Sequence, residues 1–426
     1  MTEKKIPEGY KKTEIGVIPE DWEVKKLKEV RNTLDNWSYT GGPFGSDLQT
    51  KHYTESGVRI IQLQNIGKGR FIDNVRIYTN ENKADELKAC NVYPGDIIMS
   101  KMGDPVARAC LVPEGQDRYL MCSDGIRLQV DTKSYNTSFI HDFINSAFFL
   151  SQASNASTGS TRLRIGLKQL ANLPIPIPPK KEQTAIAEAL SDIDELIQSL
   201  DKLIAKKRDI KLATMQQLLT GKTRLPGFSG EWEEKRLGDV ISLKSGYSFK
   251  SENFQDFGLP VIRIANLKNG TVEPDHSVCH PVLKISDEFI VKKDDILIAM
   301  SGATTGKIGI YKKSYPSFLN QRVGKFVCDY RIVRDTFIFG FLSSYIFKTQ
   351  LSVFLEQGAQ PNISAKQIES FSFLLPSIKE QTAIAEILSD MDSEIEALEK
   401  RRDKTIAIKQ GMMQVLLTGR VRLVGK

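Results

Sequence analysis

The stretch that decides the fold occurs twice: EQTAIAEALSDID at 182–194 returns as EQTAIAEILSDMD at 380–392, with eleven of thirteen positions identical. The offset between the copies is 198 residues, and it still holds for LLTG at 218–221 and 416–419. The repeat therefore passes without insertion or deletion, while much less similar sequence separates the copies. This pattern favours a constant spacer that joins two different recognition modules.

Each repeat has the periodicity of a long amphipathic helix. Apolar residues recur at alternating spacings of four and three, as in the seam of a coiled coil. The positions expected to form the helix-pair interface are Ile186, Leu190, Ile193, Ile197, Leu200, Ile384, Leu388, Met391, Ile395 and Leu398. Acidic residues precede basic ones along both copies, so the helices are complementary only when antiparallel. The sequence predicts an antiparallel intramolecular coiled coil; ordinary amphipathic core helices are the alternative.

The repeats divide the chain into four parts. We expect a first recognition domain at 1–178, a central helix at 179–221, a second recognition domain at 222–375, and a distal helix with a C-terminal tail at 376–426. GDIIMSKMG at 95–103 resembles DDILIAMSG at 294–302, a buried strand that enters a turn. TEIGVIPEDW at 13–22 and TRLPGFSGEW at 223–232 precede the two domains in equivalent places. We therefore expect an α+β protein in which two domains of like fold form a pseudo-twofold, circular arrangement.

Size and composition are those of an ordinary intracellular protein. The 426 residues carry a formal net charge of +7, which is compatible with binding a polyanion but does not establish it. Five cysteines without CxxC spacing indicate reduced, mostly buried thiols. The longest apolar runs are too short to span a bilayer, and the N-terminus lacks the apolar core of a signal peptide. We expect a cytoplasmic protein.

Catalytic motifs are missing from the sequence. GATTGK at 302–307 is one residue short of a phosphate-binding loop, no N/D-P-P-Y/F motif of an adenine methyltransferase occurs, and no glycine fingerprint follows an early strand. His276, Cys279 and His280 form at most a partial metal site, because no further ligand pair stands at a suitable spacing; an exposed loop is the favoured interpretation. We therefore expect no catalytic residue, no metal and no cofactor on this chain.

Polar residues on Gly-rich segments remain as a recognition surface. Asn and Gln can pair with adenine and Arg with guanine, whereas Ser, Thr and Lys favour phosphate. The candidate DNA-binding residues are Ser46, Gln62, Gln64, Asn65, Lys101, Ser160, Thr161, Arg162, Arg164, Lys168, Tyr247, Ser248, Arg263, Asn266, Thr304, Thr305, Lys307, Gln321, Arg322, Gln360, Asn362, Ser364 and Lys366. Solvated turns have the same composition, so the argument rests on the set: equivalent positions of the two domains carry different polar residues.

The chain closely resembles the specificity subunits of type I restriction-modification systems. The resemblance rests on LPIPIPPKKEQTAIAEAL at 173–190, FLLPSIKEQTAIAEIL at 373–388, the LLTG endings, TEIGVIPEDW, PFGS and QPNIS. It implies two α+β target-recognition domains, each of which reads one half of a bipartite, asymmetric DNA sequence. It also implies that the helices set the spacer and dock two methylation subunits. Restriction subunits complete the complex, and its catalysis belongs to these partners.

Two other hypotheses stay open from the sequence. One is a solitary methyltransferase or nuclease whose active site has no recognisable motif. The other is a coiled-coil adaptor whose variable domains bind proteins and not double-stranded DNA.

Overall fold

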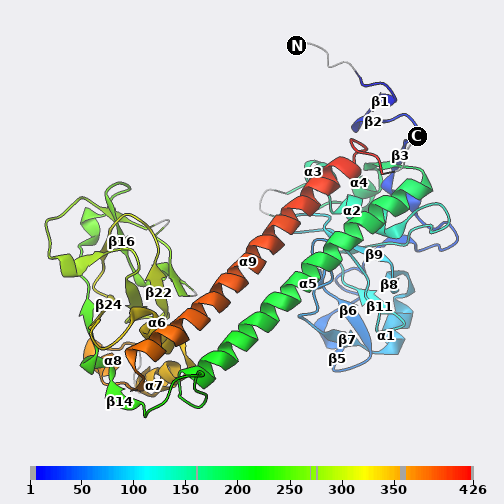
Figure 1. Cartoon of the computed structure of the whole chain (residues 1–426). Helices are drawn as coiled ribbons and strands as arrows, with labels where there is room; N and C mark the ends of the chain where they lie inside the picture. Colours follow the sequence, from blue (N-terminus) through cyan, green and yellow to red (C-terminus); the bar gives the residue numbers. More distant parts are fainter. Residues whose placement is uncertain (1–5, 160–161, 269, 275–276, 356–360, 424–426) are drawn as a thin grey trace. The chain divides into compact units, whose positions relative to one another are not determined.

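The computed structural model describes residues 6–159, 162–268, 270–274, 277–355 and 361–423 (Figure 1). The chain forms two compact units: unit 1 is Met1–Leu200 with Arg401–Lys426, and unit 2 is Asp201–Lys400. Each unit contains both sheets and helices, which confirms the α+β class. The C-terminal segment of the chain thus belongs to the same unit as its N-terminal segment.

Unit 1 is built on two sheets. The first has the strand order β10-β9-β12-β4 and is antiparallel throughout. The second has the order β5-β7-β6-β11-β8, and its central strands β6 and β11 are parallel. The strands of the two sheets are β4 (Tyr39–Gly41), β5 (Tyr53–Thr54), β6 (Val58–Ile61), β7 (Ile77–Thr79), β8 (Asn91–Val92), β9 (Ile97–Ser100), β10 (Ala109–Leu111), β11 (Tyr119–Met121) and β12 (Gly125–Leu128).

Unit 2 also has two main sheets. The larger has the order β15-β24-β21-β22-β18-β17, and the smaller has the order β19-β16-β23-β20 with β16 and β23 parallel. Their strands are β15 (Ile241–Ser245), β16 (Leu259–Ile262), β17 (Leu267–Lys268), β18 (Gly270–Val272), β19 (Cys279–His280), β20 (Ile290–Val291), β21 (Ile296–Ala299), β22 (Ile308–Tyr311), β23 (Ser317–Leu319) and β24 (Val323–Cys328).

The two units share one strand plan. The order β10-β9-β12-β4 of unit 1 returns as β22-β21-β24-β15 in unit 2, again antiparallel. The parallel pair β6–β11, flanked by β8, returns as β16–β23 flanked by β20. One fold is therefore used twice, as the strand motifs at 95–103 and 294–302 predicted.

Short helices and a two-stranded sheet complete each unit in the same way. In unit 1, β3 (Glu23–Lys26) pairs with β13 (Pro174–Ile177), and in unit 2, β14 (Glu233–Arg236) pairs with β25 (Ser372–Leu375). A further hairpin joins β1 (Tyr10–Thr13) to β2 (Gly16–Pro19). The short helices are α1 (Glu81–Glu86), α2 (Thr137–Ile144), α3 (Ala147–Asn155) and α4 (Leu167–Ala171) in unit 1, and α6 (Asp335–Ser343), α7 (Tyr345–Leu355) and α8 (Ala365–Glu369) in unit 2.

Two long helices carry the repeats, α5 (Lys180–Leu218) and α9 (Ile378–Leu416), drawn in green and in orange to red in Figure 1. Pro179 precedes α5, where a missing N–H costs nothing, and the hydroxyl of Ser377 accepts the N–H of Glu380 at 3.4 Å at the start of α9. Gly221 and Gly419 follow the helices with φ of 68° and 69°. Glycine adopts this left-handed conformation without strain, which ends both helices at the same point of the repeat.

The helical segments run in opposite directions within each unit. In unit 1, Asp194 of α5 pairs with Lys409 of α9 at 2.6 Å. Glu182, nearer the start of α5, pairs with Arg422, which lies beyond the end of α9. In unit 2, Lys207 pairs with Glu394 at 2.6 Å, and Lys211, further along α5, pairs with Asp392, nearer the start of α9. Acidic residues of one repeat therefore meet basic residues of the other in both units, as the charge order along the helices predicted.

The predicted helix-pair residues fall into two groups. Buried residues are Ile186, Leu190, Leu200, Ile384, Leu388 and Ile395, and half-buried residues are Ile193, Ile197, Met391 and Leu398. Ile186 and Leu190 pack into the main apolar core of unit 1 together with Leu416 and Leu417, while Ile384 and Leu388 pack into that of unit 2. The predicted interface residues Ile186, Leu190, Ile384 and Leu388 therefore belong to the cores of the two units. A continuous coiled coil stays a prediction.

Among the described residues, no lone helix is both long and apolar enough for a bilayer span. By length and composition alone, only α6 and α7 taken together, with a 60° bend between them, meet that requirement.

Candidate nucleic-acid interface

An equivalent polar turn follows the central parallel strand in each unit. In unit 1 this is the 3-10 turn Leu63–Asn65, and in unit 2 it is Ile264–Asn266. Gln62 precedes the first turn and Arg263 precedes the second, and both side chains are half-buried. The same backbone thus presents an amide in one unit and a guanidinium in the other.

Asn65 and Asn266 stabilise these turns through side-chain hydrogen bonds to the backbone. The side-chain oxygen of Asn65 accepts the N–H of Gln62 at 2.9 Å, and that of Asn266 accepts the N–H of Arg263 at the same distance. Their amide groups donate to oxygens across the turn, such as the Ile72 carbonyl at 2.8 Å. Both residues are buried. Their hydrogen-bonding groups are used inside the domain, so a DNA contact of Asn65 or Asn266 would compete with these bonds and stays a prediction.

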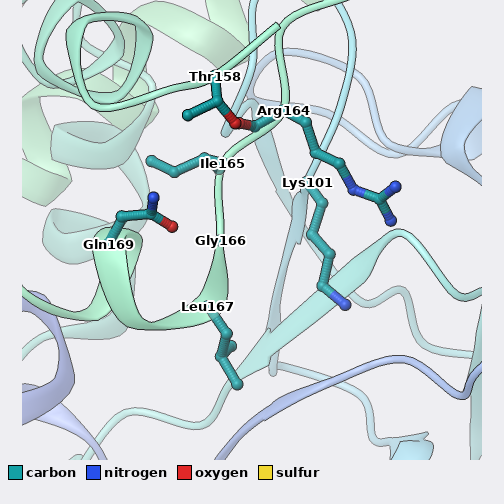
Figure 2. Close-up of a pocket in the computed structure, with 7 residues that line it drawn as sticks. All are labelled: Lys101, Thr158, Arg164, Ile165, Gly166, Leu167 and Gln169. Atoms are coloured by element: carbon teal, nitrogen blue, oxygen red, sulfur yellow. The ribbon is translucent and has the colours of Figure 1, made fainter.

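A pocket of about 300 Å³ in unit 1 is lined by two of the basic residues predicted to bind DNA, Lys101 and Arg164 (Figure 2). Lys101 follows β9, and Arg164 precedes α4; their side chains extend to the same side in the figure. The Lys101 ammonium donates to the Ser123 carbonyl at 3.0 Å, and Arg164 forms an ion pair with Asp124 at 2.5 Å. Burial lowers the pKa of Lys101, while the nearby Asp124 carboxylate acts in the opposite direction. Thr158, Leu167 and Gln169 line the same pocket.

A residue that the sequence did not single out joins these turns. The Arg108 guanidinium donates to the carbonyls of Leu63 at 3.0 Å, Ile66 at 2.6 Å and Met102 at 3.3 Å. It therefore holds the turn that carries Gln64 against the turn that follows Lys101. A lone arginine in a basic chain gives no signal of this role, because its acceptors are backbone carbonyls.

Unit 2 has a pocket of about 390 Å³ beside its own polar turn. Arg263, Asn320, Gln321 and Arg322 supply its polar lining, and aromatic side chains supply part of its apolar lining. Tyr247 lies near this aromatic group, with its ring centroid 5.0 Å from that of Phe249. Three predicted residues, Arg263, Gln321 and Arg322, therefore converge on one place.

Other predicted residues of unit 2 have structural partners. The Thr305 hydroxyl lies 2.6 Å from the Gly302 carbonyl and 2.7 Å from that of Pro361. The Thr304 hydroxyl donates to the Ile264 carbonyl at 3.4 Å, and Ser364 caps α8 through its hydroxyl. These contacts order the loop, so any contact with a nucleic acid would compete with them.

Eight of the remaining predicted residues are exposed. Exposed ones are Ser46, Gln64, Arg162, Lys168, Ser248, Lys307, Asn362 and Lys366. Ser160, Thr161 and Gln360 lie outside the described residues. The structure therefore leaves these eight positions accessible without grouping them into a single pocket.

The histidine and cysteine cluster requires a correction. His280 does not lie in an exposed loop: it is 5% exposed, and the centroid of its ring lies 5.1 Å from that of the tilted Phe249 ring. His276 lies outside the described residues. Within the described part of the chain, no group of three or more His, Cys, Asp or Glu side chains could hold a metal ion. The five cysteines are free, and three of them are buried.

Comparisons with known proteins agree with this architecture. The family described as the type I restriction modification DNA specificity domain matches residues 19–206 and 229–407. The MjaVIII specificity subunit of Methanocaldococcus jannaschii, a type I restriction enzyme subunit, is 27% identical over 95% of this chain and 94% of its own length. The EcoBI specificity subunit of Escherichia coli is 23% identical over 94% of this chain and 85% of its own length.

Solved structures show the same fold at low identity. A chain from a structure of the assembly and conformational transition of the type I R-M system matches with a TM-score of 0.61 and 16% identity, over 95% of this chain and 99% of its own. The type I S subunit from M. genitalium matches with a TM-score of 0.54 and 18% identity, over 93% and 96%. Because the family match covers both halves of the sequence, the chain belongs to the family of type I restriction-modification specificity subunits.

Proposed function

We propose that this chain is the DNA-reading subunit of a type I restriction-modification complex and has no catalytic activity of its own. Each recognition domain reads one half of a bipartite, asymmetric target. The observation that carries the proposal is the use of one strand plan in both units with different polar residues at equivalent places, such as Gln62 and Arg263. A two-part target with unlike halves requires this combination.

The recognition domains in this proposal are 1–178 and 222–375, joined by the central helix at 179–221 and followed by the distal helix and tail at 376–426. The two helices pair as an antiparallel coiled coil that closes a pseudo-twofold, circular arrangement and sets the DNA spacer. A 39-residue helix is about 58 Å long at 1.5 Å per residue. DNA half-sites one turn apart lie about 34–36 Å from centre to centre. The helix length is therefore sufficient for a spacer of that scale.

The partners in this proposal are double-stranded DNA, two methylation subunits and, in the full complex, restriction subunits. Large apolar side chains remain exposed along the two long helices: Leu196, Leu203, Ile210, Leu212, Ile406 and Ile408. Exposed apolar groups of this kind favour a protein interface. They support docking of the methylation subunits on the helices, and S-adenosylmethionine and ATP would then belong to those partners. We expect the complex to act in the cytoplasm, where its DNA is.

The test is to map methylated adenines genome-wide in cells that carry this chain with its partner subunits. We expect one bipartite sequence with a fixed gap between unlike halves. Methyl transfer by the purified chain alone would support the solitary-enzyme hypothesis. Failure of every two-part DNA to compete with random DNA would support a protein-binding adaptor.

A further inference from the structure

Three positions near the unit 1 pocket have exact backbone counterparts in unit 2. The N–H of Lys101 donates to the Asp124 carbonyl at 2.7 Å, and its own carbonyl accepts from Ile165 at 2.9 Å. In unit 2, Met300 makes the same two bonds, with Arg322 and with Ile363, each at 2.9 Å. The backbone at these positions is therefore conserved between the units.

The same register places Arg164 and Asn362 at equivalent points. Arg164 forms an isolated antiparallel bridge with Met102, and Asn362 forms one with Ser301. The three equivalent positions carry Lys101, Asp124 and Arg164 in unit 1, and they carry Met300, Arg322 and Asn362 in unit 2. Because the backbone is shared but the side chains differ in charge, we expect the two units to differ in specificity at these positions.

The carboxylate in unit 1 constrains the arginine beside it. Asp124 Oδ1 lies 2.5 Å from Nη2 of Arg164, and the Asp124 side chain is 18% exposed while that of Arg164 is 56% exposed. One edge of the guanidinium is therefore anchored while much of the group faces solvent. An arginine has five N–H donors in a rigid planar fork, so this anchor leaves donors for a further acceptor.

The chemistry of Lys101, Asp124 and Arg164 favours contact with the edge of a base over contact with a phosphate. A carboxylate at this distance opposes the approach of a phosphate oxygen to the same guanidinium. A G·C pair instead offers the O6 and N7 acceptors of guanine to arginine and the N4 donor of cytosine to a carboxylate. Lys101 adds a second cation, so the trio has a net positive charge that suits DNA.

We infer that Asp124 is a positioning residue that orients Arg164 to read a guanine in the half-site bound by unit 1. The inference rests on the proposed function, and it adds a residue, a base and a mechanism to it. Arg164 makes the base contact through O6 and N7, while Asp124 fixes the plane of the guanidinium. Unit 2, with Arg322 and Asn362 at these positions, reads its half-site by a different arrangement.

The experiment compares Asp124→Ala and Arg164→Lys with the wild-type chain in complex with its methylation partner. Binding is measured on bipartite DNA in which each position of both half-sites is varied in turn. In both variants, the preference for the G·C pair over other pairs at one position of one half-site should fall about tenfold, the size of effect expected for one bidentate base contact. The other half-site should be read unchanged. Asp124→Ala should also bind random DNA more tightly, because a negative charge is removed.

The matched control is Asp85→Ala, which removes a carboxylate that pairs with Arg118 at 2.6 Å elsewhere in unit 1. It should leave discrimination unchanged at every position. If the wild-type complex reads a bipartite site but either Asp124→Ala or Arg164→Lys discriminates as well as the wild type at every position, the inference is overturned. If the wild-type complex reads no such site, the proposed function itself fails. Should Asp124→Ala not fold, Asp124→Asn replaces it, because the amide keeps the shape of the carboxylate and removes the charge that pairs with Arg164.

Discussion

Arg422, near the C-terminus, is predicted to control the stability of unit 1. Glu182 at the start of α5 is fully buried and accepts three hydrogen bonds: two from the Arg422 guanidinium at 2.5 and 2.7 Å, and one from Trp22 Nε1 at 3.0 Å. Arg422 also pairs with Asp21 at 2.8 Å. Residues from the beginning, middle and end of the sequence therefore meet at one buried carboxylate.

Arg422→Ala would remove the only cation shown pairing with Glu182 among the described residues. Breaking a buried pair by removing one partner costs about 3–5 kcal/mol, because the remaining charge is left without compensation. The side chain of Arg422 is 28% exposed, so water can partly replace it, and we expect the lower end of that range, about 3 kcal/mol. For a unit of this size, a loss of 1 kcal/mol lowers the Tm by roughly 2–4 °C, which gives a decrease of roughly 6–12 °C.

The assay is calorimetric or circular-dichroism melting of the full chain. Arg420→Ala is the matched control, because Arg420 lies in the same tail and is exposed. Adding Glu182→Gln to Arg422→Ala should restore part of the lost Tm, since the uncompensated charge is removed. If Arg422→Ala melts within about 1 °C of Arg420→Ala, the buried carboxylate does not depend on the tail and the reasoning is refuted.

Three further outcomes are expected. Leu190→Asp should destabilise unit 1 by several kcal/mol, because a lone charge would be placed at a fully buried position; an unchanged Tm would contradict that burial. Hydrogen bonds from Arg76 and from Arg59 lower the pKa of Asp73 to about 2, below its ordinary 3.8. Its contribution to stability is therefore present above about pH 4 and is lost as the pH falls towards 2, so the Tm difference between wild type and Asp73→Asn should vanish over that range. Gln64→Ala should relax specificity in one half-site and Asn362→Ala in the other, which is measured on the same DNA variants; equal losses in both halves would count against separate reading.

Local sequence patterns predicted the long helices well. The central helix was expected at 179–221 and lies at Lys180–Leu218, because periodicity, the preceding proline and the following glycine all act within a few residues. The strands were harder to predict. Most have two to four residues, which is too short for hydrophobic periodicity to give their order, and the parallel pairing of β6 with β11 joins segments about sixty residues apart.

The sequence does not show which polar side chains of the candidate site are free to contact DNA. Asn65 has the residue type of a base-reading side chain, yet its amide completes a local turn, which only the fold reveals. The pairing of Asp124 with Arg164 could not be predicted either, because the two residues lie forty residues apart in the sequence. Long-range pairing of side chains decides which polar groups are available, and a single sequence does not contain that information.

Ion pairs that stabilise unit 1 have counterparts in unit 2. The Glu182–Arg422 pair of unit 1 recurs in unit 2 as Glu380 with Arg224, at 2.6 Å and again with a tryptophan N–H donating to the carboxylate.

The buried pair of Arg127 with Asp96 likewise recurs as Lys325 with Asp295. Positions that build the fold thus keep their charge pattern across the repeat. Position 124 does not, because the aspartate there corresponds to Arg322 in unit 2. Since the two units experience the same packing constraints, a reversal of charge on a preserved backbone is more readily explained by different targets than by different folding requirements.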